Sequence, residues 1–489
     1  MKRYIILLII KNLFVCLLAM ASFGFLSQSS YAELNKENNS KIELPDTIPR
    51  ARWGEGWFLY DPELLRDYPL LYLKNIPLNK SGESNLSLGG EYRFTYELYD
   101  PADRGLTNTG KSDVVLNRIA LHADWHIDKN WRVFGQLGAA FAGDREGGNK
   151  VGDETALNIW QLFVEGNYPV NNSDRLKFRL GRQFIEKANW FIGAGEAPNV
   201  RQYYDGIRLV VQEKDFLKFD AYISEFVDIS TEQFDMKGNG EYFWGTSASI
   251  HIEPSRLNLT FYYLGWSLKD REFQQGNGSL YDETRHSLLL WLNKAVRFDK
   301  NWALDYYLVY QFGQYEDSRN SNINAYSAFG ELKYAFYAKE ETPIVGLKLS
   351  YFSGDNDPDD NQLNTFYNPI FVTPYFTYAR DVRPYNLIHI QPNISYRFSR
   401  RLTLALSTDF LWRASKNDAF YTGANKIGVD ARASDASFIG TQSQIAINWK
   451  PTRNIVNALH LVHYSSGDVV SDAGGTDQNY MHFGFNFLF

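Results

Sequence analysis

Runs of alternating apolar and polar residues extend over most of the sequence, and they restrict the chain to β-structure. In residues 115–127, Leu121 and Trp125 share one face, while Arg118 and Asp124 share the other. A period of two is that of a strand with one polar face, whereas a helix would mix the two faces. Tyr and Phe, with 32 and 34 residues, supply much of the apolar face, as is typical of strands.

Eighteen runs of this kind are predicted to be strands. The first begins near residue 86, and the others lie near 115–127, 131–141, 156–165, 175–183, 203–212, 216–226, 241–252, 256–267, 284–295, 301–313, 324–337, 343–353, 386–398, 401–413, 437–449, 454–464 and 479–489.

The connections between these runs are sorted by length. Connections after even-numbered strands are short, and those after odd-numbered strands are long. Short ones lie at 128–130, 213–215, 253–255, 299–300, 399–400 and 450–453, and long ones at 100–113, 143–154, 184–202, 228–240, 269–283, 354–384, 414–436 and 465–478. A soluble sandwich of two sheets has no reason to sort its loops in this way.

Long outer loops and short periplasmic turns are typical of outer-membrane barrels, in which an even strand number leaves both termini in the periplasm. The sequence therefore predicts an all-β fold, an 18-stranded antiparallel transmembrane β-barrel. Each strand of such a barrel needs only about ten residues, so no long apolar helix is required.

The first 32 residues have the features of a secretory signal peptide. Lys2 and Arg3 precede an apolar run over residues 4–18, and Ser30-Tyr31-Ala32 fits a cleavage site. An uncleaved membrane anchor is the alternative. We expect cleavage near Ala32, a periplasmic segment over 33–85 that leads into the barrel, the barrel itself over 86–489, and a location in the outer membrane of a Gram-negative cell.

Charge and cysteine content restrict the partners of the mature chain. Loss of residues 1–32 removes three cations and no acid, which changes the net charge from −7 to −10 and makes nucleic acid a poor partner. It also removes Cys16, the single cysteine of the sequence, so disulfides cannot stabilise the mature protein.

The final strand ends on an aromatic residue. Phe483, Phe485, Phe487 and Phe489 fall on one face. A terminal Phe after alternating aromatics is similar to the signal by which the barrel-assembly machinery recognises its substrates, so we expect this machinery and outer-membrane lipid to be partners. An ordinary hydrophobic strand is the alternative.

Strand parity predicts a cationic lumen, because polar residues face inward in such barrels. The predicted lumen bases are Arg93, Arg118, Arg132, Arg175, Arg179, Arg208, Arg256, Arg397, Arg413, Lys177, Lys218, Lys333 and Lys348, and the acids are Glu91, Glu97, Asp124, Glu165, Asp220, Glu253, Asp305, Glu331 and Asp409. An excess of bases lowers the barrier for carboxylates or phosphates. The alternative is that these cations pair with neighbouring acids. Arg182 faces lipid unless a bulge shifts the register.

Catalytic and metal-binding signals are weak. The sequence lacks the GxSxG, HExxH, Walker and dinucleotide fingerprints. Asp355, Asp357 and Asp359 have the spacing of a calcium loop without its Gly and Glu, and His122 and His126 share a face without a third ligand. We therefore predict no enzymatic activity, cofactor or metal. A barrel enzyme and a structural barrel with a blocked lumen remain as alternatives.

Short motifs occur in a defined order along the chain. They are Arg52-Trp53-Gly54-Glu55-Gly56-Trp57, Leu88-Gly89-Gly90-Glu91 with Arg93, Leu180-Gly181-Arg182-Gln183, Pro198-Asn199-Val200-Arg201, Asp205-Gly206-Ile207-Arg208, Phe410-Leu411-Trp412-Arg413 and Trp449-Lys450-Pro451-Thr452-Arg453. This ordered set resembles the alginate export family of outer-membrane barrels.

The resemblance implies an 18-stranded barrel through which a polyanionic uronate polymer leaves the cell along an arginine-rich constriction. It implies a constriction formed by Arg93, Arg118, Arg179, Arg201, Arg208 and Arg413. We expect the rest of the transport pathway to include Arg132, Lys177, Glu91, Asp124, Asp205 and Asp409.

The predicted function is a monomeric channel for anionic solutes, with alginate or a similar acidic polysaccharide as the leading export substrate and periplasmic polysaccharide-secretion proteins as partners. A substrate-selective uptake porin for small organic acids is the alternative. No long insertion is visible in the periplasmic turns, which weakens the case for a gated exporter. The loop at 354–384 could fold over the outer mouth or be an ordinary exposed loop.

Overall fold

The computed structural model describes residues 44, 48–49, 51–150, 152–169, 175–186, 190–193, 199–213, 217–234, 237–252, 257–274, 278–293, 301–337, 341–423 and 426–489. The predicted signal peptide and its cleavage site near Ala32 lie outside these residues. In the described part of the chain, no helix is long and apolar enough to cross a membrane.

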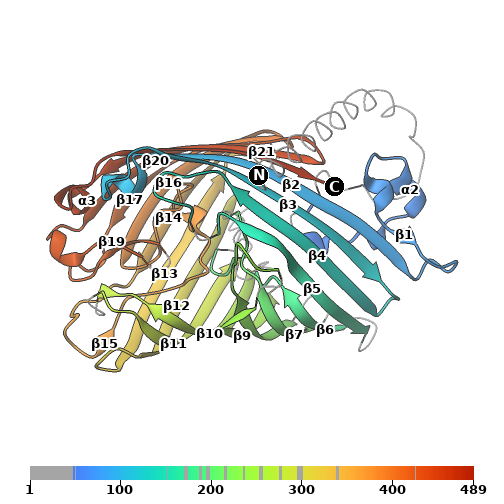
Figure 1. The fold of residues 1–489 in the computed structure, drawn as a ribbon, viewed down its shortest axis with the longest axis horizontal. Helices are drawn as coiled ribbons and strands as arrows, with labels where there is room; N and C mark the ends of the chain where they lie inside the picture. Colours follow the sequence, from blue (N-terminus) through green and yellow to red (C-terminus); the bar gives the residue numbers. More distant parts are fainter. Residues whose placement is uncertain are drawn as a thin grey trace.

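Eighteen long antiparallel strands of the described residues form a closed barrel (Figure 1). The barrel closes because β2 pairs with β3 on one side and with β22 on the other. The strands are β2 (Asn85–Asp100), β3 (Ser112–His126), β4 (Trp131–Ala142), β5 (Thr155–Pro169), β6 (Arg175–Gln183), β7 (Tyr204–Glu213), β8 (Leu217–Val227), β9 (Gly238–Ile252), β10 (Leu257–Arg271), β11 (Tyr281–Asn293), β12 (Trp302–Tyr315), β13 (Ser321–Ala335), β14 (Pro343–Phe352), β16 (Leu387–Ser399), β17 (Leu402–Trp412), β20 (Phe438–Thr452), β21 (Ile455–Ser466) and β22 (Gln478–Leu488). The predicted fold class is confirmed.

The two faces of the strands have the predicted chemistry. On β3, Leu121 and Trp125 are exposed on the outside of the barrel, whereas Arg118, His122 and Asp124 are buried on the inside. The period-two pattern therefore assigned the faces correctly for this strand, because strand side chains alternate between the two sides of a sheet.

The barrel has a loop end and a turn end, named after their connections. One connection departs from the predicted sorting by length, because residues 316–320 at the loop end are fewer than residues 336–342 at the turn end. Asp317 accepts hydrogen bonds from the backbone N–H groups of Arg319 (3.2 Å) and Ser321 (2.9 Å). A side chain that satisfies its own backbone in this way makes a tight turn possible.

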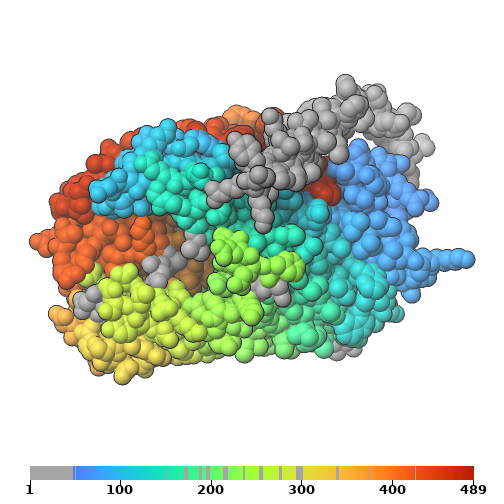
Figure 2. All heavy atoms as spheres, in the orientation of Figure 1, coloured from blue at the N-terminus to red at the C-terminus, as the bar shows by residue number. Residues whose placement is uncertain are grey.

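An N-terminal segment covers part of the turn end. It contains η1 (Arg52–Gly54), η2 (Trp57–Leu59), α2 (Pro62–Arg66), η3 (Leu71–Leu73) and β1 (Ile76–Pro77), which pairs with β2. Its buried residues Trp57, Leu65 and Leu71 pack against Val456 and Leu488 of the barrel. Figure 2 shows this segment in blue, at the opposite end of the molecule from the orange and red loops. The turn end is thus covered by a segment that precedes the barrel rather than by an insertion in a turn.

The connection 353–386 folds into the barrel from the loop end, and the alternative of an ordinary exposed loop is wrong. It contains β15 (Gln362–Leu363) and η6 (Thr373–Tyr375). Phe366 and Phe376 are fully buried and contact Phe352 of the barrel wall. The loop is drawn inward because its aromatic side chains have apolar partners on the lumen face of the strands.

The other loop-end connections carry small elements. They are η4 (Ala102–Gly105), the hairpin of β18 (Phe420–Gly423) and β19 (Lys426–Val429), η7 (Ala431–Ala433) and α3 (Asp468–Asp472).

Candidate functional site

A cavity of about 430 Å³ opens inside the barrel at the turn end, and we call it the turn-end vestibule. Its walls are the N-terminal segment, the turn between β3 and β4, and strands β4 to β7 with Lys218 of β8. The charged residues of its lining are Lys129, Arg132, Lys177, Arg179, Arg208, Lys218, Asp128 and Glu165, and its aromatic residues include Trp53 and Phe58.

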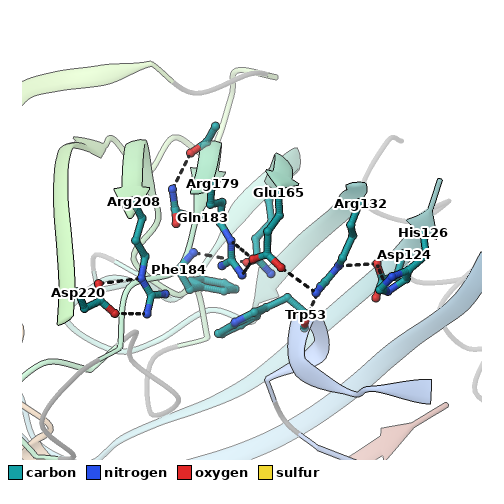
Figure 3. Close-up of polar contacts among 12 residues, drawn as sticks. Trp53, Asp124, His126, Arg132, Glu165, Arg179, Gln183, Phe184, Arg208 and Asp220 are labelled. Atoms are coloured by element: carbon teal, nitrogen blue, oxygen red, sulfur yellow. Dashed lines mark hydrogen bonds and ion pairs between the residues drawn. The ribbon is translucent and has the colours of Figure 1, made fainter. Parts of the chain in front are cut away.

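Four of these charges form a row across neighbouring strands. Arg132 lies opposite Glu165, Glu165 opposite Arg179, and Arg179 opposite Arg208 in the strand registers. Glu165 lies 2.5 Å from Arg179 and 3.6 Å from Arg132, measured between carboxylate oxygen and guanidinium nitrogen. Figure 3 shows these side chains on the inner face of the sheet. The row exists because lumen-facing positions of adjacent strands lie side by side.

Two further acids pair with the ends of this row. Asp124 lies 2.7 Å from Arg132, and Asp220 lies 2.7 Å from Arg208 (Figure 3). Even with these two acids included, the vestibule holds six bases and four acids among the described residues. Lys177 and Lys218 form no ion pair within the described part of the chain. The described charges of the vestibule therefore sum to a net positive charge, and a charge of this sign favours anions over cations.

Deeper in the lumen, a second group of charges surrounds Glu91. Arg118 lies 2.7 Å from its carboxylate, and Arg201 lies 4.0 Å from it. Arg118 also donates a hydrogen bond of 3.3 Å to the carbonyl of Asn199, which ties the connection between β6 and β7 to the barrel wall. Arg93, on the same strand as Glu91, donates to the hydroxyl of Thr95 at 3.1 Å.

A larger cavity of about 690 Å³ lies at the other end of the barrel, and we call it the loop-end cavity. Its charged lining residues are Arg104, Arg145, Lys150, Arg380, Arg383, Lys426, Glu97, Asp103, Glu146, Asp153 and Asp381. Six bases thus face five acids among the described lining residues. The charge of this cavity is nearly balanced.

Ion pairs at the loop end join different connections. Arg145 lies 3.0 Å from Asp153 and 3.7 Å from Glu97, which also pairs with Arg380 of the inward-folded loop. Such pairs, buried and shared between loops, hold the loops in place and leave little charge for a solute.

Most predicted lumen residues do face the barrel interior. Glu91, Arg93, Arg118, Asp124, Arg132, Arg179, Arg208 and Asp409 are inside the barrel on lumen-facing strand positions, and Lys177 lines the turn-end vestibule. Arg201 lies in the connection before β7 and also points inward, toward Glu91. Arg256 and Glu253 lie outside the described residues.

The structure corrects the predicted position of Asp205. It lies opposite Arg182 and pairs with it through two hydrogen bonds of 2.8 Å. Both residues share the outward face with exposed Ile207 and Leu180. Arg182 therefore faces the outside of the barrel, as the parity of its strand predicts. Its partner Asp205 lies on the same outward face. We had expected Asp205 to belong to the transport pathway in the lumen, and the strand register does not support this.

The structure also corrects the predicted role of Arg413 in the constriction. Its guanidinium donates hydrogen bonds to the backbone carbonyls of Asp418 (3.2 Å), Ser434 (2.6 Å) and Ala436, all in the loop that begins at Arg413 itself. Three carbonyl partners satisfy most of its donors. Arg413 therefore holds the loop 413–437 together and is not placed to bind a solute.

Asp409 is inside the barrel but covered. It lies 2.6 Å from His389 and 2.6 Å from Gln391, beneath residue Phe376 of the inward-folded loop, whose carbonyl accepts from Gln391 and Gln444. In the same wall, Lys348 donates to the carbonyl of Tyr375 at 2.7 Å. These lumen positions are therefore filled by the chain itself.

Several residues that matter at both ends were absent from the predicted site. Trp53, Arg145 and Arg380 lie in segments without strand periodicity, so parity could not assign them a face. The motif around Trp53 stands out in the sequence, but nothing in it indicates that the segment returns to the barrel mouth.

Metal binding has no support in the described residues, where no three His, Cys, Asp or Glu side chains come together as ligands would. His126 lies 3.6 Å from Asp124, and His122 lies 3.7 Å from Glu55. Each of the two histidines thus lies near one acid rather than in a cluster of ligands.

Comparisons with known proteins agree with this architecture. Residues 84–483 match the family described as "Alginate export". Two solved outer-membrane structures of Pseudomonas aeruginosa share the fold, at 12% sequence identity each. OccK9 (OpdG) aligns over 83% of this chain and 98% of its own with a TM-score of 0.53, and OccK2 (OpdF), solved in complex with glucuronate, over 82% and 96% with a TM-score of 0.51. The search of curated proteins found no match.

Proposed function

Because this chain belongs to the alginate export family and folds as a closed outer-membrane β-barrel, we propose that it carries an acidic polysaccharide, such as alginate, outward from the periplasm. The family and fold are those of channels and not of enzymes. The observation that carries the proposal is the difference in charge between the two cavities. The cationic one lies at the turn end, which faces the periplasm in barrels of this class.

Charge at the point of entry determines which solutes a channel collects. A cationic mouth raises the local concentration of anions and their rate of entry, while a balanced mouth does not. An exported polyanion enters from the periplasm, so export requires the cationic mouth at the turn end. Uptake would require it at the loop end.

The row of charges suits a polymer better than a single small anion. Neighbouring strands lie about 4.8 Å apart, so the guanidinium groups of Arg132, Arg179 and Arg208 extend across several strand widths. A chain with one carboxylate on each sugar ring can exchange its carboxylates for Asp124, Glu165 and Asp220 along this row. Arginine favours such exchange because it binds carboxylates through two parallel hydrogen bonds.

Uptake of small organic acids is the second candidate. The loop-end cavity supports it, because a volume of about 690 Å³ suits a small ligand. In addition, OccK2 (OpdF), which shares the fold of this chain, was solved with glucuronate, a small sugar acid.

The two directions can be separated by adding the solute to one side of a planar bilayer. Residues 33–489 contain no cysteine, so a Lys80→Cys variant of this part of the chain, labelled at the exposed hairpin beside the turn end, reports the orientation of each inserted barrel. We expect oligouronates to block the current with an on-rate at least about tenfold higher from the turn end than from the loop end. A higher on-rate from the loop end, or block by small acids only, would favour the uptake porin.

A further inference from the structure

A column of aromatic rings ends in the turn-end vestibule. Trp160 packs on Tyr203, Tyr203 on Phe184 and Phe184 on Trp53, with distances of 5.8, 5.2 and 5.3 Å between ring centroids. The first three rings are buried, whereas Trp53 is half-buried and lines the vestibule beside Arg132 and Arg179 (Figure 3). Trp53 is thus the accessible end of a packed stack.

The backbone around Trp53 is fixed from two sides. Arg52 is buried and donates hydrogen bonds to the carbonyl of Gly90 on β2, at 3.1 Å, and to the carbonyl of the terminal Phe489. Arg132 donates to the carbonyl of Trp53 itself. An anchored backbone and a packed ring mean that Trp53 loses little conformational freedom when a ligand binds, which favours affinity.

The position of Arg52 is itself supported by a network. Its guanidinium lies 2.9 Å from Glu55, and Glu55 lies 3.1 Å from Lys74. All three side chains are buried in the N-terminal segment. Burial lowers the pKa of Lys74 to about 8, and the opposing effect of Glu55 helps to keep the ammonium charged near neutral pH.

An aromatic ring between guanidinium groups selects for a particular chemistry. A pyranose uronate has an apolar face of C–H groups and a carboxylate at its edge, so one ring can stack on an indole while its carboxylate binds an adjacent arginine. A plain carboxylate has no such face. The binding sites of small ligands commonly combine apolar surfaces with a few placed polar groups in this way.

We infer that Trp53 is a specificity-determining residue, a platform on which a uronate ring stacks while Arg132 or Arg179 holds its carboxylate. This inference rests on the proposed function, since it assigns a sugar selectivity to the vestibule through which the anion is proposed to enter. It places the determinant of selectivity for sugar acids in the N-terminal segment, outside the barrel strands.

The test compares two anions with equal charge and different shape. Single-channel block is measured with an oligouronate and with an oligoglutamate that has the same number of carboxylates, both added at the turn end. The variants are Trp53→Leu, which keeps apolar packing against Phe184, and Trp53→Phe, which keeps a ring. Tyr72→Ala is the matched control, because Tyr72 is an exposed aromatic of the same segment that does not line the vestibule.

We expect Trp53→Leu to weaken block by the oligouronate about tenfold and block by the oligoglutamate less than twofold, Trp53→Phe to recover most of the loss, and Tyr72→Ala to change neither. Equal weakening of both anions, or no change for either, would overturn the inference. If the wild-type channel is blocked by neither anion, the proposed function itself fails, and this outcome is distinct from a Trp53 variant that loses no selectivity.

Discussion

The turn-end vestibule and the loop-end cavity hold the same number of lining bases, but these bases are paired with acids to different extents. At the loop end, Arg104 pairs with Asp381 at 2.9 Å, and Arg145 and Arg380 both pair with Glu97. At the turn end, Lys177 and Lys218 add charge beyond the paired arginines. The number of lining cations therefore does not distinguish the two cavities, whereas their balance with nearby acids does.

The difference follows from what holds each region together. The turn-end vestibule is built mainly on strands, whose backbone hydrogen bonds already fix their positions. The loop-end cavity is built from connections that lack such a ladder and are joined by side chains instead, such as Arg104 to the carbonyl of Asp381. Charges on such a preformed wall are not needed to hold the wall together.

The largest effect is expected from removing the arginines of the vestibule. The triple substitution of Arg132, Arg179 and Arg208 by Gln should weaken oligouronate block about 100-fold, since each charged hydrogen bond at a partly solvated site contributes on the order of 1 kcal/mol. Titration of single-channel block measures the change. The control is the triple substitution of Lys150, Arg383 and Lys426 by Gln at the loop end, with an expected change below about threefold. Equal losses in the two variants would contradict the comparison.

A smaller effect is expected from a change of pH, which should alter the stability of the loops at the loop end only. The backbone N–H of Asp355 and the hydroxyl of Thr365 both donate to Asp418, at 2.9 and 2.6 Å, so this carboxylate joins loops 353–386 and 413–437. Burial, and then the nearby charge of Asp418, raise the pKa of Asp355 to about 7, from an ordinary value of 3.8. Burial also raises the pKa of Asp418.

The raised pKa of Asp355 determines the direction in which loop stability changes with pH. The folded loops favour protonated Asp355, so its contribution to their stability is fully present below pH 3.8 and is lost as the pH rises through about 7. Protection of residues 353–386 from hydrogen exchange, corrected for intrinsic rates, should be higher at pH 5.5 than at pH 8.5. Asp355→Asn should remove most of this difference and leave the turn end unchanged. Equal protection at both pH values in the wild type would refute the assignment.

The smallest effect is expected from single acids, and it sharpens the distinction between the two faces of the barrel. Asp220→Asn frees Arg208 of its partner inside the vestibule and should raise anion selectivity about twofold to threefold. Asp205→Asn is the matched control, because Asp205 pairs with Arg182 on the outer face and should leave selectivity unchanged. Reversal potentials in a salt gradient measure both. A selectivity change in the Asp205 variant would contradict the outward position of this residue and indicate that it faces the lumen.

The site was predictable from the sequence where it lies on strands. The alternation around Arg132, Arg179 and Arg208 is enough to place all three in the lumen, because the side chains of a strand can face only two ways. The prediction for Asp205 was wrong because it did not follow the alternation of its strand, which puts Asp205 on the same outward face as the exposed Ile207.

Parity alone was also insufficient for Arg413. Its position has inward parity, as predicted, but it is the residue at which the strand gives way to a loop, and the carbonyls of that loop bind its guanidinium. Local periodicity cannot report a partner such as Ser434, 21 residues away along the chain.

The sequence by itself determined the architecture, namely eighteen strands, their faces and which connections are long at all but one position. These are local properties, since a period of two and a run of turn residues depend on neighbouring positions alone. The tertiary structure decided what fills the barrel. The inward fold of loop 353–386 depends on contacts with the lumen face of the barrel wall, such as Phe352. The return of Trp53 to the turn end depends on contacts with Phe184 and Arg132, far away in the sequence. The free energy of such contacts comes from burial against surfaces that exist only once the barrel has closed.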